Sequence, residues 1–411
     1  MEKGDFPSLL CYVSFGKDIL ESARVNKNNF SQKTNISSHR VFVFLEIFAR
    51  EGGIQSYVKD IFQAYRSLIP PDRTGGKTEI FLLRDEPECA NPFDRGSMKF
   101  HYFKTRSAWM GRLKLSLSLI NCLIQRRPQQ VLCGHVNLAA LIKLLCQPLG
   151  IPYTVLTYGK EVWKPLPALQ RKALQEAAEI WTISRYSRDR LCDANQINPD
   201  TVKILPCVVD GDLFTPAPKP LQLVEKYGLN DAKVLMTVAR LWSGDIYKGV
   251  DVTIRALPKI VKVFPEVKYL VIGRGDDRPR LEQLTKDLGV SDRVIFAGFV
   301  PTEELVDHYR VADAYIMPSQ EGFGIVYLEA MACGIPVLSG DADGSADPLQ
   351  DGDLGWQVPH RDPDAVATAC LEILQGNDKR CNGEWLREQA LAKFSKKALS
   401  KRLQELLETK H

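Results

Sequence analysis

The sequence contains no C-x-x-C pair, although ten of its 411 residues are cysteine. None of these cysteines stands at zinc-ligand spacing with one of the six histidines either. The spacing therefore argues against a structural metal, and we expect no metal site and no bound cofactor. We interpret the cysteines as reduced thiols of a cytoplasmic protein.

Long apolar segments are also lacking. The N-terminus carries Glu2 and Asp5 and has no basic segment followed by the apolar run of a signal peptide. No stretch reaches the ~18 uninterrupted apolar residues of a membrane span. We therefore expect a cytoplasmic protein that contacts at most the inner face of a membrane, as a peripheral protein.

Acidic residues are absent from one long stretch. Residues 95–160 hold ten Lys and Arg and no Asp or Glu, within a chain of net charge +4. Residues 1–215 carry 29 basic and 21 acidic residues, whereas residues 216–411 carry 25 and 29. An anionic partner of the N-terminal half is therefore expected. Nucleic acid is not expected, because no recognised nucleic-acid motif accompanies the basic stretch.

The remaining sequence alternates short β-rich apolar runs with longer amphipathic stretches, which predicts parallel βαβ units. The length suits two domains of about 200 residues each. We expect an α/β protein with two doubly wound, Rossmann-like sheets and a cleft between them. The expected strands lie within residues 41–48, 79–84, 129–133, 153–157, 179–184, 202–206, 233–241, 267–275, 293–300, 314–319 and 336–340.

The domain boundaries follow from composition. Residues 1–38 lack an apolar period, and the segment after residue 212 is rich in proline. The expected parts are an N-terminal extension (1–38), an N-terminal acceptor-side domain (39–212), a linker (213–222), a nucleotide-sugar-binding domain (223–385) and a C-terminal helical segment that can cross back to the N-domain (386–411).

The strongest motif is PSQEGFGIVYLEAMACGIPVL, in which a strand leads through Glu321 and a Gly-Phe-Gly turn into a helix that carries Glu329. The glycines let backbone approach a ligand, and the helix N-terminus attracts phosphate. Carboxylates beside it suit sugar and ribose hydroxyls. The alternative is that both glutamates only complement the helix dipole.

The E-x7-E spacing, with G-F-G after the first glutamate and E-A-M-A-C-G-I-P-V around the second, resembles the signature of family-4 retaining glycosyltransferases. The resemblance extends from about Arg40 to Phe394 and implies the GT-B fold. It implies that Glu321 contacts hydroxyls of the donor sugar and that Glu329 contacts the ribose. Backbone amides of Phe323, Gly324 and Ile325 would face the diphosphate.

A second motif, VARLWSGDIYKGVD, places Arg240 after a strand and Lys248 before a helix. It resembles the paired cations of the family, with a longer loop between them. Together with Glu321 they form the expected catalytic set, because two fixed cations can stabilise a departing diphosphate without a metal. The alternative is that both are ordinary surface charges.

Further donor contacts are expected from glycine-rich loops. Gly273 and Gly275 follow a strand, and the segment from Gly298 to Val300 resembles the loop that cradles the base through backbone groups. Gly53, after the first strand, would pass close to the donor phosphates. Each loop can alternatively be a plain turn.

Loops after two N-terminal strands supply the acceptor-side candidates. His135 follows one strand, and Tyr158 and Glu161 follow the next. The family often has histidine where Tyr158 stands. A lone histidine is as often structural as catalytic, so both readings stay open.

Residues 107–128 place apolar side chains near helical period, with basic residues between them. Such a helix could bind anionic lipid. The alternative is that the stripe packs on the N-terminal sheet. The apolar stripe comprises Trp109, Met110, Leu113, Leu117, Ile120, Leu123 and Ile124.

These features predict a retaining, metal-independent hexosyltransferase. Its substrates would be a nucleotide-diphosphate sugar, with a UDP-sugar favoured, and a carbohydrate or lipid-linked acceptor in polysaccharide or glycolipid synthesis. The resemblance implies front-face attack without a protein nucleophile. A nucleotide-sugar epimerase, a phosphorylase and a non-catalytic nucleotide-sugar-binding or membrane-surface scaffold are the alternatives.

Overall fold

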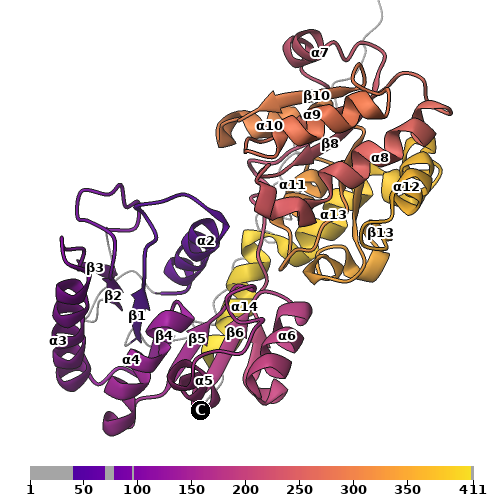
Figure 1. Ribbon diagram of the computed structural model, residues 1–411. Coiled ribbons are helices and arrows are strands. Elements are labelled where there is room, and N and C mark those ends of the chain that lie inside the picture. The colour runs from indigo at the N-terminus through magenta and orange to yellow at the C-terminus, as the bar shows by residue number, and fades with distance from the viewer. Residues whose placement is uncertain (1–39, 70–77, 95–96, 409–411) are drawn as a thin grey trace, which may run out of the picture. The chain divides into compact units, whose positions relative to one another are not determined.

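The computed structural model describes residues 40–69, 78–94 and 97–408, which belong to one compact unit. The expected N-terminal extension, Cys11 and Arg95 lie outside the described residues. Two entirely parallel β-sheets, each flanked by helices, make up this unit (Figure 1). The prediction of two doubly wound α/β sheets is confirmed.

The first sheet has the strand order β3-β2-β1-β4-β5-β6-β7. Both faces are covered: alternate residues of the first strand, Phe42 and Phe44 against Val41 and Val43, belong to two different cores. Its strands are β1 Arg40–Phe44, β2 Thr78–Leu82, β3 Met98–Tyr102, β4 Gln130–Cys133, β5 Tyr153–Leu156, β6 Glu179–Thr182 and β7 Val202–Ile204. Its helices are α2 Gly53–Leu68, α3 Ala108–Arg126, α4 Val136–Cys146, α5 Ala168–Gln175 and α6 Arg185–Asn195.

The second sheet has the order β10-β9-β8-β11-β12-β13. Its strands are β8 Lys233–Val238, β9 Val267–Ile272, β10 Val294–Gly298, β11 Ala314–Met317, β12 Val337–Gly340 and β13 Trp356–Val358. Its helices are α7 Leu221–Tyr227, α8 Val250–Val261, α9 Arg278–Asp287, α10 Thr302–Val311, α11 Ile325–Ala332, α12 Pro363–Gln375 and α13 Gly383–Phe394.

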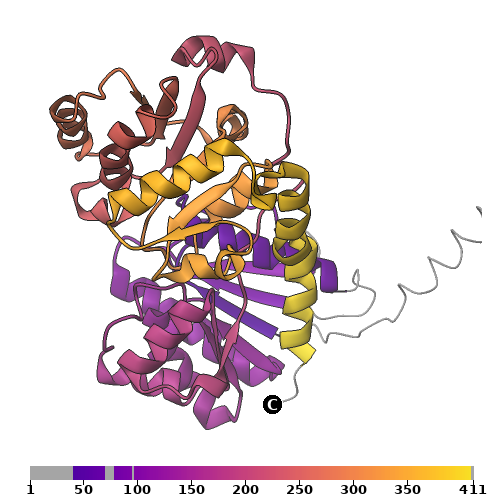
Figure 2. The ribbon, with the colours of Figure 1, turned by 90° about the vertical axis from the view of Figure 1, so that its right-hand side faces the viewer.

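The last described helix, α14 Lys396–Glu408, packs on α2 of the first sheet. Arg402 donates a hydrogen bond to the carbonyl of Ile204 (3.0 Å), and Arg40 donates one to the carbonyl of Leu407 (2.7 Å). Figure 2 shows α14, in yellow, running beside the strands of the first sheet. The chain thus enters the second sheet and returns to the first.

In both sheets the strand order reverses beside the first strand, at β1/β4 and at β8/β11. Loops at the carboxyl ends of the strands diverge at such a point and leave a crevice for ligands. The predicted site residues follow β1, β4, β5, β8, β9, β10 and β11, so they lie at these edges.

Candidate active site

A cavity of about 280 Å³ joins the carboxyl edges of the two sheets. From the first sheet it is lined by the start of α2 and by residues after β5, β6 and β7. From the second sheet it is lined by Val238, Lys248 and the segment from Glu321 to Val326. The predicted residues in its wall are Gly53, Tyr158, Lys248, Glu321, Phe323, Gly324 and Ile325.

Lys248 and Glu321 form an ion pair in the cavity wall. Their side chains are only 17% and 16% exposed, so water screens the pair weakly. Lys248 ends a 3-10 turn, Ser243–Lys248, and Gly249 after it has φ 74°. A Cβ at Gly249 would lie 2.5 Å from the carbonyl oxygen of Pro318, so glycine permits this close approach to the end of β11.

The backbone of Glu321 is held by Asp343, a residue that the sequence reasoning missed. The Asp343 carboxylate accepts hydrogen bonds from the N–H of Glu321 and from the N–H of Ser345 (2.8 Å). Burial raises the pKa of Asp343 to about 6, although these hydrogen bonds oppose the shift. The only sequence signal for this role was its place shortly after β12.

The Gly-Phe-Gly turn leads directly into α11, and the N–H groups at the start of this helix are not capped by a side chain. Gly324 is the N-cap with φ 91°, no side chain caps the helix, and its first turn has no acidic residue. The ring of Phe323 is buried against Phe394, with ring centroids 5.8 Å apart, so only backbone of this residue can face a ligand. An uncapped N-terminus of this kind favours an anion.

Glu329 lies one helical turn further along α11 and is not part of the cavity wall. Its Oε2 accepts a hydrogen bond from the hydroxyl of Tyr309 (2.7 Å), another residue that the motif did not reveal. Burial raises the pKa of Glu329, and the Tyr309 hydroxyl opposes this shift. Among the described residues no donor is bonded to the other carboxylate oxygen, which leaves it able to accept from a ligand.

Arg240 does not line this cavity, although it lines a small separate pocket together with Lys248. Its guanidinium pairs with Asp245 (3.0 Å) and lies over the ring of Trp242 at 4.9 Å, and its side chain is 59% exposed. Both partners come from the long loop between the two cations. The lengthened loop therefore supplies Arg240 with contacts of its own.

A third cation, Lys160, reaches this region from the loop after β5. Its Nζ lies 3.3 Å from the ring centroid of Tyr247, and the Nζ of Lys248 lies 5.4 Å from the same ring. Desolvation lowers the pKa of Lys160, while the charges of Glu321 and Asp245 act against the shift. Sequence reasoning missed it because nothing local indicates that it meets the second sheet.

The predicted glycines divide into two kinds. A Cβ at Gly53 would meet no atom within 4 Å, so the start of α2 faces open space. At Gly273 and Gly275 a Cβ would lie 1.8 and 1.9 Å from the carbonyl oxygens of Ala239 and Leu241. The latter two glycines thus allow backbone packing between the loops after β8 and β9.

The loop after β10 supports the same packing. The N–H of Gly273 donates to the carbonyl of Gly298 (2.8 Å), and Gly298 has φ 76°. Val300 is half-buried and does not line the cavity. The structure thus groups this loop with Gly273 and not with Lys248 and Glu321.

The three acceptor-side candidates are engaged in fixing their own loops. The Tyr158 hydroxyl donates to the carbonyl of Gly134 (2.6 Å), and Glu161 accepts from the N–H of Tyr158 (2.5 Å). His135 caps α4, its Nδ1 accepting from the N–H of Asn137 (3.1 Å). Desolvation and then the charge of Arg84 lower the pKa of His135, so the neutral imidazole is favoured. Of the three, only Tyr158 lines the cavity.

Two side chains from the start of α6 link the first sheet to the second. The Ser184 hydroxyl donates to the carbonyl of Gly322 (2.6 Å). Arg185 pairs with Asp347 and Asp351, and its N–H donates to Asp347 (2.7 Å). These contacts hold the Gly-Phe-Gly turn against the first sheet. Within the described residues no group of three His, Cys, Asp or Glu side chains is placed to hold a metal.

Comparisons with known proteins agree with this arrangement. A family model described as "Glycosyl transferases group 1" matches residues 232–376, which include Lys248, Glu321 and Glu329. The "GDP-mannose-dependent alpha-(1-6)-phosphatidylinositol monomannoside mannosyltransferase" of Mycolicibacterium smegmatis is 37% identical over 232 residues, covering 53% of this chain and 59% of that protein. The chain spans only about 60% of the length of the first relatives that it matches.

Longer matches come at lower identity. A "GDP-mannose-dependent monoacylated alpha-(1-6)-phosphatidylinositol monomannoside mannosyltransferase" of Corynebacterium glutamicum is 28% identical over 88% of this chain and 95% of its own length. The crystal structure of Anabaena HepE in complex with UDP has a TM-score of 0.72 at 18% identity and covers 90% of this chain and all of that one. Sucrose-phosphate synthase from Thermosynechococcus elongatus has a TM-score of 0.68 at 20% identity, with 89% and 97% covered.

The solved structures establish the fold alone, which is GT-B: two Rossmann-like parallel-sheet domains. The family match and the relatives agree with the E-x7-E segment at the cavity. Residues 232–376 match the group 1 glycosyltransferases, and the chain resembles the family-4 glycosyltransferases, as the motif predicted.

Proposed function

We propose that this protein is a retaining glycosyltransferase that transfers mannose from GDP-mannose to a lipid-linked acceptor. The observation that carries the proposal is the cavity in which Lys248 and Glu321 meet beside the uncapped N-terminus of α11. The donor is suggested by relatives that are 28–37% identical and are named as GDP-mannose-dependent mannosyltransferases. The sequence-based preference for a UDP-sugar has no support in these names.

The proposed donor pose gives each group one task. The N–H groups at the start of α11 and the ammonium of Lys248 bind the diphosphate. Glu321 accepts hydrogen bonds from hydroxyls of the mannose, and the second oxygen of Glu329 accepts one from the ribose. Lys248 and Glu321 neutralise each other until the donor enters and separates them. Arg240 pairs with Asp245 through one nitrogen of its guanidinium, so its other N–H groups can join the diphosphate.

Transfer then needs no protein nucleophile. The acceptor hydroxyl attacks the anomeric carbon on the face from which the diphosphate departs. A carbon–oxygen bond to the acceptor forms, the bond to the phosphate oxygen breaks, and the hydroxyl proton passes to the departing diphosphate. Lys248 stabilises the negative charge that develops on this diphosphate. The anomeric configuration is retained.

Calorimetry with GDP-mannose and UDP-glucose tests the donor, and NMR of the product tests the stereochemistry. We expect GDP-mannose to bind more tightly and the product to keep the anomeric configuration of the donor. Glu321→Gln should lose transfer, whereas Glu303→Gln, an exposed glutamate at the start of α10, should keep it. An inverted product, or an isomerised sugar formed without acceptor, would contradict the proposal.

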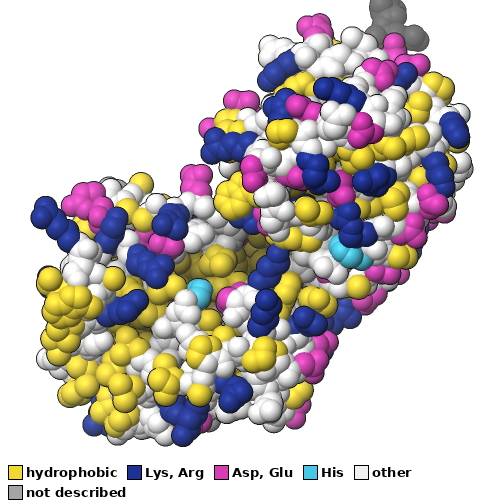
Figure 3. All heavy atoms as spheres, in the orientation of Figure 1, with side chains coloured by type: hydrophobic (Ala, Val, Ile, Leu, Met, Phe, Trp, Pro, Cys, Tyr) yellow, Lys and Arg dark blue, Asp and Glu magenta, His cyan; other side chains and the backbone are white. Residues whose placement is uncertain are grey.

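An exposed apolar face on α3 supports a lipid-linked acceptor. Packing of the whole predicted stripe on the sheet is wrong, because the helix buries only Leu123 of the stripe, together with Leu115, Leu119 and Cys122 from outside it. Most of the stripe is exposed, with Trp109 at 64% and Leu117 at 61%. Figure 3 shows hydrophobic side chains gathered over the region of α3 and α4. None of the described helices is both long enough and apolar enough to span a bilayer.

We propose that this face rests on an anionic bilayer. The helix carries basic residues and no acidic one, so apolar insertion and attraction to anionic lipid act together. Leu113→Gln with Leu117→Gln should weaken sedimentation with phosphatidylglycerol vesicles about tenfold or more. Leu221→Gln, on α7 with a side chain that is 76% exposed, is the control. Equal binding by both variants would contradict this orientation.

A further inference from the structure

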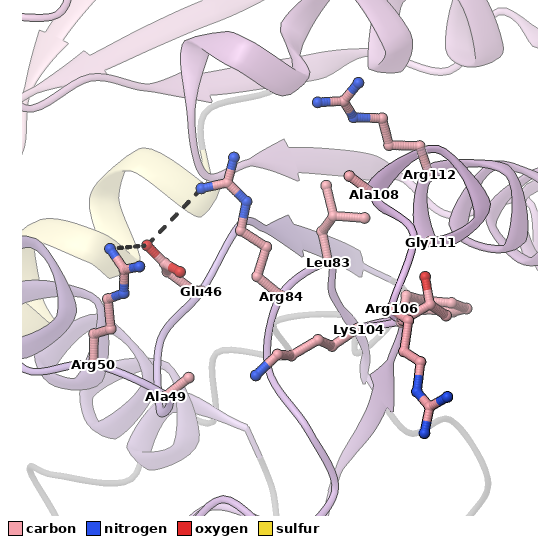
Figure 4. A pocket seen from close by; sticks show the side chains of 12 residues that line it. Glu46, Ala49, Arg50, Leu83, Arg84, Lys104, Arg106, Ala108, Gly111 and Arg112 are labelled. Carbon is pink, nitrogen blue, oxygen red and sulfur yellow. Dashed lines mark ion pairs between the residues drawn. The ribbon is translucent and has the colours of Figure 1, made fainter.

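A second cavity, of about 360 Å³, lies at the carboxyl edge of β1, β2 and β3, outside the proposed donor site. Its wall contains five Lys and Arg side chains and one carboxylate, Glu46, so the wall carries a formal charge of +4. Figure 4 shows Arg50 and Arg84 directed at Glu46, and Lys104 and Arg112 on either side of Leu83, while Arg106 points away. The five cations of the wall are Arg50, Arg84, Lys104, Arg106 and Arg112.

The acidic partners neutralise only part of this charge. Glu46 lies 3.8 Å from Arg50 and 4.0 Å from Arg84, at the outer limit of an ion pair. Lys104 pairs with Glu86 at 2.9 Å, and both of these side chains are nearly half exposed. Arg112 has no acidic partner among the described residues. The cavity therefore retains an excess of positive charge.

The start of α3 points its dipole at the same cavity. Thr105, Ala108 and Gly111 line the wall. The N-cap, Ser107, makes no side-chain capping hydrogen bond, and the first turn of this 19-residue helix has no acidic residue. The uncovered N–H groups and the positive end of the dipole thus add to the cationic side chains.

The loops around the cavity are held firmly. The buried carboxylate of Asp85 accepts hydrogen bonds from the N–H groups of Ile47 (2.7 Å), Phe48 (2.9 Å) and Ala49 (2.6 Å). This fixes the segment between Glu46 and Arg50. A Cβ at Gly111 would lie 2.7 Å from the carbonyl oxygen of Phe103, so the start of α3 packs closely on the loop that carries Lys104. The cations project from a rigid frame.

We propose that this cavity binds a phosphate ester group of the acceptor. Guanidinium forks and N–H groups at a helix start are the donors that match phosphate oxygens. An adjoining cavity of about 490 Å³ shares Leu83, Arg84 and Arg112 with it and is otherwise walled largely by apolar residues such as Leu115 and Leu141. A phosphate with an apolar substituent matches this pair of cavities. The inference rests on the proposed transferase function, since it specifies the acceptor of that reaction.

The position along the sheet fits an acceptor whose reacting hydroxyl lies at a distance from its phosphate. In the order β2-β1-β4-β5, the strand β5 leads to Tyr158 in the donor-side cavity. Two or three strand spacings separate the cavities, roughly 10–15 Å. Arg84 is near enough to His135 to lower its pKa, and the ring of His135 lies 6.3 Å from that of Tyr158. The two cavities therefore share one edge of the sheet, and an extended acceptor can reach from one to the other.

Binding of myo-inositol 1-phosphate and of phosphatidylinositol vesicles tests the assignment, because the first probe carries a free phosphate ester and the second a lipid headgroup. Arg112→Gln should weaken binding of at least one probe about tenfold or more and remove its salt dependence in part. Lys114→Gln lies on the same helix, is exposed and does not line the cavity. It changes the net charge equally and should bind myo-inositol 1-phosphate like the unaltered protein, whereas both variants lose the same general attraction of α3 to anionic vesicles.

GDP-mannose binding separates this inference from the proposed function. Arg112→Gln should bind GDP-mannose as the unaltered protein does and should raise KM for a phosphorylated acceptor without lowering kcat. Suppose that the protein binds GDP-mannose and transfers the sugar, but that Arg112→Gln changes neither the KM for the acceptor nor the binding of the probes. This result would overturn the phosphate site and leave the proposed function intact. Phosphate-probe binding that depends on Arg112 in a protein that does not bind GDP-mannose would support the phosphate site and overturn the proposed donor. If Lys114→Gln and Arg112→Gln lost binding of myo-inositol 1-phosphate equally, the effect would be one of general surface charge, and the site would be overturned.

Discussion

Replacing Lys248 by glutamine separates a stability effect from a catalytic one at the same ion pair. The ammonium of Lys248 and the carboxylate of Glu321 are each about five-sixths buried. Breaking a fully buried pair costs about 3–5 kcal/mol, and an exposed pair is worth about 0–1 kcal/mol. For this partly exposed pair we expect a loss of ~1–3 kcal/mol in the free energy of unfolding.

The activity of Lys248→Gln should fall further. Removing one group that stabilises developing negative charge typically lowers kcat about 10²–10³-fold. Adding Glu321→Gln removes the unpaired carboxylate, so the double variant should regain part of the lost stability while activity stays low. From the single to the double variant, stability should therefore recover in part, whereas activity should not.

Urea unfolding and initial rates of GDP release measure the two effects. Lys259→Gln, on α8 with an exposed pair to Asp364, is the matched control and should change neither quantity appreciably. If Lys248→Gln kept half or more of kcat/KM, Lys248 would not stabilise the departing diphosphate. If the double variant were no more stable than the single one, the ion pair would not contribute as its burial implies.

Three other predictions concern the same site. Gly53→Ala should leave the free energy of unfolding unchanged or raise it by up to ~1 kcal/mol. It should nevertheless weaken GDP binding in calorimetry, because the new Cβ enters open space. Gly273→Ala, at φ 141°, should instead lower stability. Asp343 has a pKa raised to about 6, so kcat/KM should fall as pH drops below 6, and Asp343→Asn should lose this inflection. Because the pKa of Asp343 is raised in the folded form, the folded form binds this proton more tightly than the unfolded form does. The contribution of Asp343 to stability therefore increases as the pH falls from 6 to 4. Acid unfolding caused by this group would contradict the assignment. Tyr309→Phe removes the hydrogen bond to Glu329 and should weaken GDP binding roughly tenfold, an effect that unchanged calorimetry would refute.

The strands that sequence patterns predicted are those that carry a continuous apolar run. Each of the eleven predicted segments overlaps an observed strand, and most of these strands are buried on both faces, which requires such a run. The two unpredicted strands, β3 and β13, are edge strands of their sheets, as are the predicted strands β7 and β10, but β3 and β13 lack an apolar run. The first is Met-Lys-Phe-His-Tyr and the second has only three residues. These two strands form because each pairs with a neighbouring strand of its sheet, and their own sequences show no apolar pattern.

The amphipathic pattern of α3 gave two interpretations that the sequence could not separate. Its residues at helical spacing include two apolar faces, and either can meet the sheet. Leu115 and Leu119 occupy the buried face, which leaves Leu113 and Leu117 exposed. Which face turns inward depends on the register of the helix on strands β1, β2 and β4, which is a tertiary property.

The sequence by itself determined the local chemistry around Glu321. The strand, the Gly-Phe-Gly turn and the helix start lie within about a dozen residues, so their spacing alone creates an anion-binding helix terminus next to a carboxylate. Only the tertiary structure decided which distant groups meet there. It brings Lys248 to Glu321, holds Arg240 on Asp245, and joins Arg50 and Arg84 to the cations of α3. These contacts depend on strand order and loop packing. The residues that form them lie tens of positions apart in the sequence, so no local pattern indicates that they are neighbours.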